Sequence, residues 1–143
     1  MRPLSLVACL AASTALANAS GVVGYSGKPP VSDCNGCHNG GNAPTVSFSG
    51  PTTLGAGATG TYTFTVNGGG GFGVDIAASD PSASLNPVST TLGVAFGELH
   101  QKARITGTTS VQFSLTAPPF AGTVTLYGTG NAVNGDGNTG GAR

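Results

Sequence analysis

The residues from 34 to 38 carry most of the chemistry in this chain, and they read Cys34-Asn35-Gly36-Cys37-His38. Two thiols separated by two residues and followed at once by an imidazole form the C-x-x-C-H pattern of covalent haem attachment. In such a segment each thiol forms a thioether with a haem vinyl group, and the histidine binds the iron from one face. The motif therefore predicts one haem c, held by Cys34 and Cys37, with His38 as an iron ligand.

Two other interpretations of the same residues stay open. A CxxC pair can form a local disulfide, although the thioredoxin-type motif belongs to a βαβ context that this sequence does not show. A structural zinc site needs four Cys or His ligands. Without the leader peptide described below, the chain offers Cys34, Cys37, His38 and His100 for this role. Haem attachment is the favoured interpretation.

The second axial ligand of the iron is predicted from the remaining residue types. The only methionine is Met1, which is lost with the leader, so His/Met ligation is excluded. On a strand, Glu98, His100, Lys102 and Arg104 share one face, because side chains alternate between the two faces. We expect His100 to bind the iron, and Lys102 or Arg104 to lie near the haem propionates. The alternatives are a solvated edge with an unligated histidine, a five-coordinate iron, or a ligand from another molecule.

The first 19 residues have the pattern of a secretory signal peptide. Arg2 supplies the positive start, residues 4–17 form an apolar run, and Ala17-Asn18-Ala19 is a small-x-small cleavage site. The run is too short to anchor the chain in a membrane. Export to the periplasm, the cell surface or the medium is expected, and it agrees with the motif because bacteria attach haem c outside the cytoplasmic membrane.

The composition excludes several classes of function. Only 7% of the residues are charged and the formal net charge is zero, so no basic patch for nucleic acid is present. No apolar run after the leader is long enough for a membrane span. No convincing catalytic triad can be assembled, and no catalytic residue is assigned. A redox partner is implied by the haem, but the sequence does not indicate which one.

Period-2 alternation dominates the chain after the motif. Residues 20–44 are rich in Gly, Ser and Pro and are expected to be extended. From residue 45 onward, short alternating runs are separated by turn residues, as in an all-β sandwich. Strands are expected near 46–48, 61–66, 72–76, 99–105, 111–115 and 124–126. We predict an Ig-like, reeler-like β-sandwich of about seven strands over residues 45–143.

Several short segments resemble a known group of exported proteins. They are Gly24-Tyr25-Ser26-Gly27, the CxxCH motif, Gly71-Phe72-Gly73, Glu98-Leu99-His100, residues 116–118, residues 122–128 and residues 130–137. Over about residues 22–140 the chain resembles the "choice-of-anchor V" domains and the myxobacterial proteins with an MXYO-type C-terminal sorting tail. The resemblance implies export and an Ig-like or reeler-like domain behind the CxxCH motif. A histidine on a later strand of that group maps to His100, with Leu99 where threonine is usual. No apolar sorting tail precedes Arg143, so we expect a soluble member or one held by a partner.

Two functions from different classes follow from these observations. The first is an exported, cytochrome-like monohaem protein with a role in electron transfer or haem-based redox chemistry. The second is a non-enzymatic extracellular Ig-like module in which the CxxC forms a disulfide. A haem sensor or a peroxidase-like protein with an open iron site ranks third, because no distal arginine stands beside a histidine.

Overall fold

Alternating apolar residues build two antiparallel sheets, as the sequence predicts. The computed structural model describes residues 20–31, 33–36, 38 and 40–134. The first sheet has the strand order β1-β2-β7-β4, made of Thr45–Ser49, Thr59–Asn67, Ser110–Thr116 and Ser84–Pro87. The second has the order β5-β6-β3-β8, made of Leu92–Ala95, Glu98–Gln101, Phe72–Ala78 and Leu126–Ala132. A 3₁₀ turn, η1, spans Cys34–Gly36. The predicted signal peptide lies outside the described residues.

The core lies between the two sheets and is assembled from the inward-facing residues of each. In β2, Tyr62, Phe64 and Val66 are buried, while the residues between them are partly or fully exposed. The ring of Tyr62 stacks on that of Phe113 from β7 with centroids 5.7 Å apart. Burying a phenylalanine or leucine side chain contributes roughly 1.5–3 kcal/mol. The all-β sandwich is therefore confirmed, with eight strands among the described residues rather than about seven.

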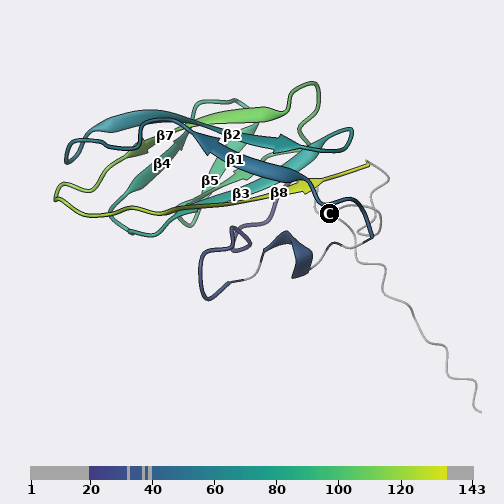
Figure 1. Ribbon diagram of the computed structural model, residues 1–143, viewed down its shortest axis with the longest axis horizontal. Coiled ribbons are helices and arrows are strands. Elements are labelled where there is room, and N and C mark those ends of the chain that lie inside the picture. Colours follow the sequence, from purple (N-terminus) through teal and green to yellow (C-terminus); the bar gives the residue numbers. More distant parts are fainter. Residues whose placement is uncertain (1–19, 32, 37, 39, 135–143) are drawn as a thin grey trace, which may run out of the picture.

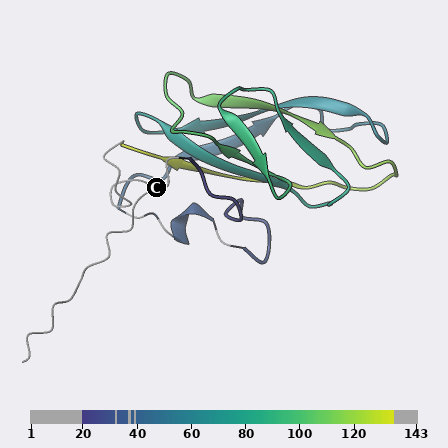
Figure 2. The same ribbon diagram turned by 180° about the vertical axis from the view of Figure 1, so that it is seen from behind.

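The strand β3 differs from β2 because both of its faces are buried. Val74 and Ile76 point into the core, and all seven residues of the strand are buried. The outer face is covered by the segment in front of β1. Residues 20–31 and η1 lie on the outer side of the sheet that contains β3 and β8 (Figures 1 and 2). The predicted extended segment thus forms a cover on one sheet.

The predicted strand over residues 99–105 is wrong in its length. The strand β6 ends at Gln101, and Ile105 returns to the sheet only as an isolated bridge to Phe72. The side chain of Gln101 takes part in the sheet in place of the backbone, because its Oε1 accepts a hydrogen bond of 2.8 Å from the Val74 N–H. Lys102 and Arg104 therefore lie beyond the end of β6, although the stem of Lys102 still lies beside the His100 ring over Gly93.

No helix within the described ranges has the length and apolar character needed to cross a membrane.

Candidate functional site

The CxxCH motif begins with a short helical turn. Asp33 caps this turn, since its carboxylate accepts hydrogen bonds from the Asn35 N–H at 2.9 Å and from Asn35 Nδ2 at 3.0 Å. The His38 N–H donates to the Cys34 carbonyl at 3.1 Å, which closes one turn between the first and last residues of the motif. Residues four apart in a helical turn lie on the same side. The turn thus places Cys34 and His38 as neighbours, while Cys37 lies outside the described residues.

The turn is attached to β8. The thiol of Cys34 donates a hydrogen bond to Thr129 Oγ1 at a distance of 3.3 Å. The hydroxyl of Thr129 in turn donates to the Tyr25 carbonyl at 2.7 Å. Figure 1 shows η1 beneath β8, the edge strand of the second sheet. The motif is therefore docked on the sandwich.

His38 has the protonation state that an iron ligand needs. Its Nδ1 is buried and has no hydrogen-bond partner among the described residues. Burial lowers the pKa of His38 below its ordinary value of 6.5, because desolvation disfavours the charged imidazolium. The imidazole is therefore neutral at neutral pH, and neutral imidazole is the form that binds metal ions. The Cys34 thiol and the His38 imidazole therefore fit a haem group.

His100 belongs to a row of residues that crosses the outer face of the second sheet. The strand register aligns Gly93, His100, Asp75 and Thr129 across β5, β6, β3 and β8. The His100 Nδ1 lies 3.2 Å from the Ser20 carbonyl oxygen and 2.9 Å from that of Gln101. A Cβ added at Gly93 would lie only 3.2 Å from His100 Nε2. The ring therefore leans over β5, on the side away from β8.

This position separates His100 from the motif. Two strand spacings lie between His100 on β6 and Thr129 on β8, which amounts to about 10 Å. The backbone of Tyr25 lies between them, since it contacts both Asp75 and Thr129. The structure thus does not bring His100 to the residues that hold Cys34. A four-ligand zinc site that includes His100 gains no support, and no three His, Cys, Asp or Glu side chains of the described residues form a metal-binding group.

The two predicted partners of the propionates also lie apart from the motif. The Lys102 ammonium donates to the Thr90 carbonyl at 3.2 Å, in the connection that leads to β5. Arg104 is exposed, and its Cδ lies close to Gly71 at the start of β3. The expectation that both share a face with His100 is wrong for Arg104, which lies past the end of β6 and close to Gly71, whereas the stem of Lys102 lies beside the His100 ring over Gly93.

A pair of acidic residues under the N-terminal segment was not predicted as part of a site. Asp75 is 2% exposed, and its Oδ2 accepts a hydrogen bond of 2.7 Å from the Tyr25 N–H. Glu98 accepts from the Gly24 N–H at 2.6 Å and from Ser26 Oγ at 3.4 Å. These carboxylates anchor residues 24–26 to the sheet. The sequence signal was only that Asp75 interrupts an otherwise apolar strand.

The environment of Asp75 changes its acidity. Burial is the largest cause that raises the pKa of Asp75 to about 7, the Tyr25 N–H opposes it, and the neighbouring Glu98 adds to it. The Oδ1 atom of Asp75 has no hydrogen-bond partner among the described residues. A side-chain hydrogen bond between Asp75 and Glu98 also raises the pKa of Asp75, because it favours the protonated form of that carboxyl group. Asp75 is therefore readily protonated.

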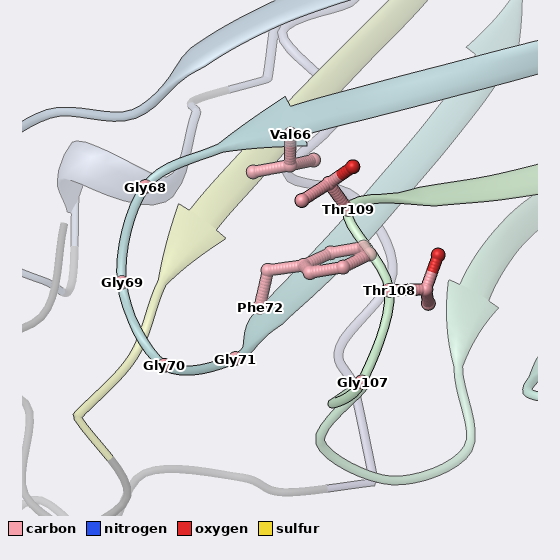
Figure 3. Close-up of a pocket in the computed structure, with 9 residues that line it drawn as sticks. All are labelled: Val66, Gly68, Gly69, Gly70, Gly71, Phe72, Gly107, Thr108 and Thr109. Atoms are coloured by element: carbon pink, nitrogen blue, oxygen red, sulfur yellow. The ribbon is translucent and has the colours of Figure 1, made fainter.

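A hollow of about 240 Å³ lies at the end of the sandwich where β2 turns into β3. It is lined by Val66 and residues 68–72 on one side and by residues 107–109 on the other. Figure 3 shows the glycine turn facing the 107–109 loop, with the ring of Phe72 between them. Its side chains are those of threonine, valine and phenylalanine, which supply neither charge nor a metal ligand. We assign no chemistry to it.

Comparisons with known proteins add no assignment, since no family model, no curated protein and no solved structure matches this chain. The resemblance to the choice-of-anchor V group therefore stays a prediction.

Proposed function

We propose that this chain is an exported c-type haem protein that carries one haem on Cys34 and Cys37, with His38 as an iron ligand. The observation that carries the proposal is the closed turn from Cys34 to His38, docked on β8 and ending in a half-buried imidazole whose Nδ1 is buried and whose pKa is lowered by desolvation. When bound, the haem supplies one-electron redox chemistry. The role that fits an exported protein of this kind is electron transfer or haem-based redox chemistry with a partner protein.

The residues of the chain contribute binding and orientation. Asp33 shapes the turn, and Thr129 holds Cys34 against the sheet. Desolvation keeps a proton off His38, so the imidazole is ready to bind without competition from protons at neutral pH. The sandwich acts as a rigid platform beneath this segment.

One observation favours the second candidate, an extracellular β module with a CxxC disulfide. In the sequence, the buried residues of the hydrophobic cluster run from Tyr62 to Leu115. The partly buried residues that pack against the cluster extend this range only to Phe48 and Leu126. The sandwich thus closes its core without residues 20–44. Such a domain is expected to fold whether or not a haem is attached.

The two candidates are separated by the spectrum of the exported protein. The full chain is expressed with a bacterial haem c attachment system, purified, and extracted with acid acetone before a pyridine haemochrome spectrum is recorded. Haem that stays with the protein, and is lost in the Cys34→Ala/Cys37→Ala variant, supports the proposal. A colourless protein whose two motif thiols resist alkylation until reduced contradicts it and supports the disulfide module. His38→Ala is the matched control for iron ligation, since both thioether positions remain.

A further inference from the structure

Thr129 joins three segments that lie far apart in the sequence. It stands on β8, its hydroxyl donates to the Tyr25 carbonyl at 2.7 Å, and it accepts from the Cys34 thiol at 3.3 Å. The hydrogen bond to Cys34 spans 95 residues of sequence. No motif in the chain marks Thr129, so its position can be recognised only in the folded structure.

The direction of these hydrogen bonds is set by chemistry. A carbonyl oxygen has no hydrogen to donate, so the single hydroxyl hydrogen of Thr129 must be used for Tyr25. The oxygen of Thr129 is then left as an acceptor, and the hydrogen in the contact with Cys34 has to come from sulfur. In this contact the Cys34 S–H is therefore the donor and the Thr129 oxygen is the acceptor.

The hydroxyl of Thr129 is held in this orientation by its surroundings. The peptide that carries Tyr25 is bound from both sides, by Asp75 at its N–H and by Thr129 at its carbonyl. Asp75 and Thr129 are register partners on adjacent strands, so the two anchors stand side by side. A Cβ added at Gly27 would lie 3.6 Å from the Thr129 methyl group, which shows how closely that turn covers it. Such support from neighbouring groups is what makes an acceptor rigid.

We propose that Thr129 is a positioning residue that docks Cys34 on β8 before haem attachment. This inference rests on the proposed function for its biological meaning, although its physical content concerns the thiol alone. Attachment breaks the S–H bond, joins sulfur to one vinyl carbon and places a hydrogen on the other, with no net oxidation. The hydrogen bond to Thr129 then ends. Until that step it holds the sulfur of Cys34 against β8, so an alkylating reagent must break this contact before it reaches the sulfur.

The test measures Cys34 alone in the full chain, in a Cys9→Ser/Cys37→Ser background produced without haem attachment. The rate of alkylation by iodoacetamide is recorded at one neutral pH for every variant and divided by the rate of the same variant in denaturant. Thr129→Val keeps the shape of the side chain and removes the hydroxyl. We expect it to react roughly three- to tenfold faster at neutral pH, which is the effect of one ordinary hydrogen bond. Thr129→Ser is expected to react as slowly as the parent.

Two controls keep the outcome decisive. Thr129→Ala also lacks the hydroxyl and adds no bulk. It takes the place of the valine variant if that variant is poorly folded, and we expect the same increase in rate. Thr59→Val removes a hydroxyl that hydrogen-bonds Thr116 within the first sheet, whereas Thr129 belongs to the second. This variant is expected to leave the rate unchanged. Equal rates for the Thr129 parent, valine and alanine variants would overturn the inference, as would a serine variant as fast as valine. Failure of every variant to acquire haem on export would refute the proposed function and leave this rate comparison intact.

Discussion

The backbone N–H of Tyr25 donates a hydrogen bond of 2.7 Å to Oδ2 of Asp75, a residue that is only 2% exposed on β3. This contact ties the segment in front of the motif to a carboxyl group that water hardly reaches. The segment that carries the motif is therefore attached to the sandwich by polar contacts rather than by an apolar core of its own. Two of the predictions below follow from this attachment.

Stability is expected to decrease as the pH rises from about 5 to 7. The pKa of Asp75 lies near 7 in the folded chain against an ordinary value of 3.8, so the folded state keeps a proton that the unfolded state has lost. The stabilisation that this proton provides is complete at pH values below 3.8, the ordinary pKa, and is lost as the pH rises through the folded-state pKa of about 7. The free energy of unfolding falls by at most about 1.4 kcal/mol per pH unit within the window.

Urea unfolding at pH 5, 6, 7 and 8 measures this dependence, and Asp75→Asn is expected to flatten it while still offering an acceptor to Tyr25. Asp80→Asn serves as the control. Hydrogen bonds from Ser82 hold the pKa of Asp80 below its ordinary value, so it does not titrate in this window. An Asp75→Asn variant with the same slope as the parent would show that another group is responsible.

Removing the carboxylate of Glu98 should loosen the N-terminal segment. Glu98 is the acceptor for the Gly24 N–H at 2.6 Å, and an N–H left without its partner costs about 1–3 kcal/mol where it remains buried. In Glu98→Ala we expect faster amide hydrogen exchange at Gly24 and Tyr25, with the strands of the sandwich unchanged. Glu98→Gln retains an acceptor oxygen and should lie close to the parent. Unchanged exchange in the alanine variant would mean that other contacts hold the segment.

The turn between β5 and β6 contains a conformation that is unfavourable for its residue. Phe96 has φ of 52° and is 96% exposed, and the following Gly97 has φ of 82°. Asparagine tolerates this left-handed region better than phenylalanine. Because little packing is lost, Phe96→Asn is expected to raise the free energy of unfolding by roughly 0.5–1 kcal/mol. Thermal unfolding measures this, and Gly97→Ala should be destabilising. A less stable asparagine variant would show that the exposed ring contributes packing after all.

Substitution of His100 tests the sequence-based expectation of two imidazole ligands. The ring leans over Gly93 on β5, and the Tyr25 backbone lies between it and the strand that holds Cys34. In a haem-loaded protein we therefore expect His100→Ala to leave the ferric spin state unchanged. It should instead remove the contact between Nδ1 and the Ser20 carbonyl, which are 3.2 Å apart. Conversion to a high-spin spectrum would establish His100 as the sixth ligand, with rearrangement of residues 20–26 on haem binding.

Local pattern was sufficient for the sandwich and for the motif. In β2 and β7 the alternation of apolar and hydroxyl side chains decides which face is buried, because the period of a strand is two residues. The short strands β4 and β5 were not predicted, since four residues carry too little alternation to be recognised. The strand through residue 105 was predicted too long, because the bond from Val74 to the Gln101 side chain depends on where β3 lies.

The arrangement around the motif was decided by tertiary structure alone. The prediction that Cys34, Cys37 and His38 act together needs only the sequence, because their spacing is local. The sequence could not show that Asp75 is buried, since an outward-facing position on a strand is covered only when residues 20–31 pack over it. It could not show that Thr129 meets Cys34 or that His100 leans away toward β5. Those relationships depend on the order of strands in the sheet, which long-range pairing of residues determines and no local pattern records.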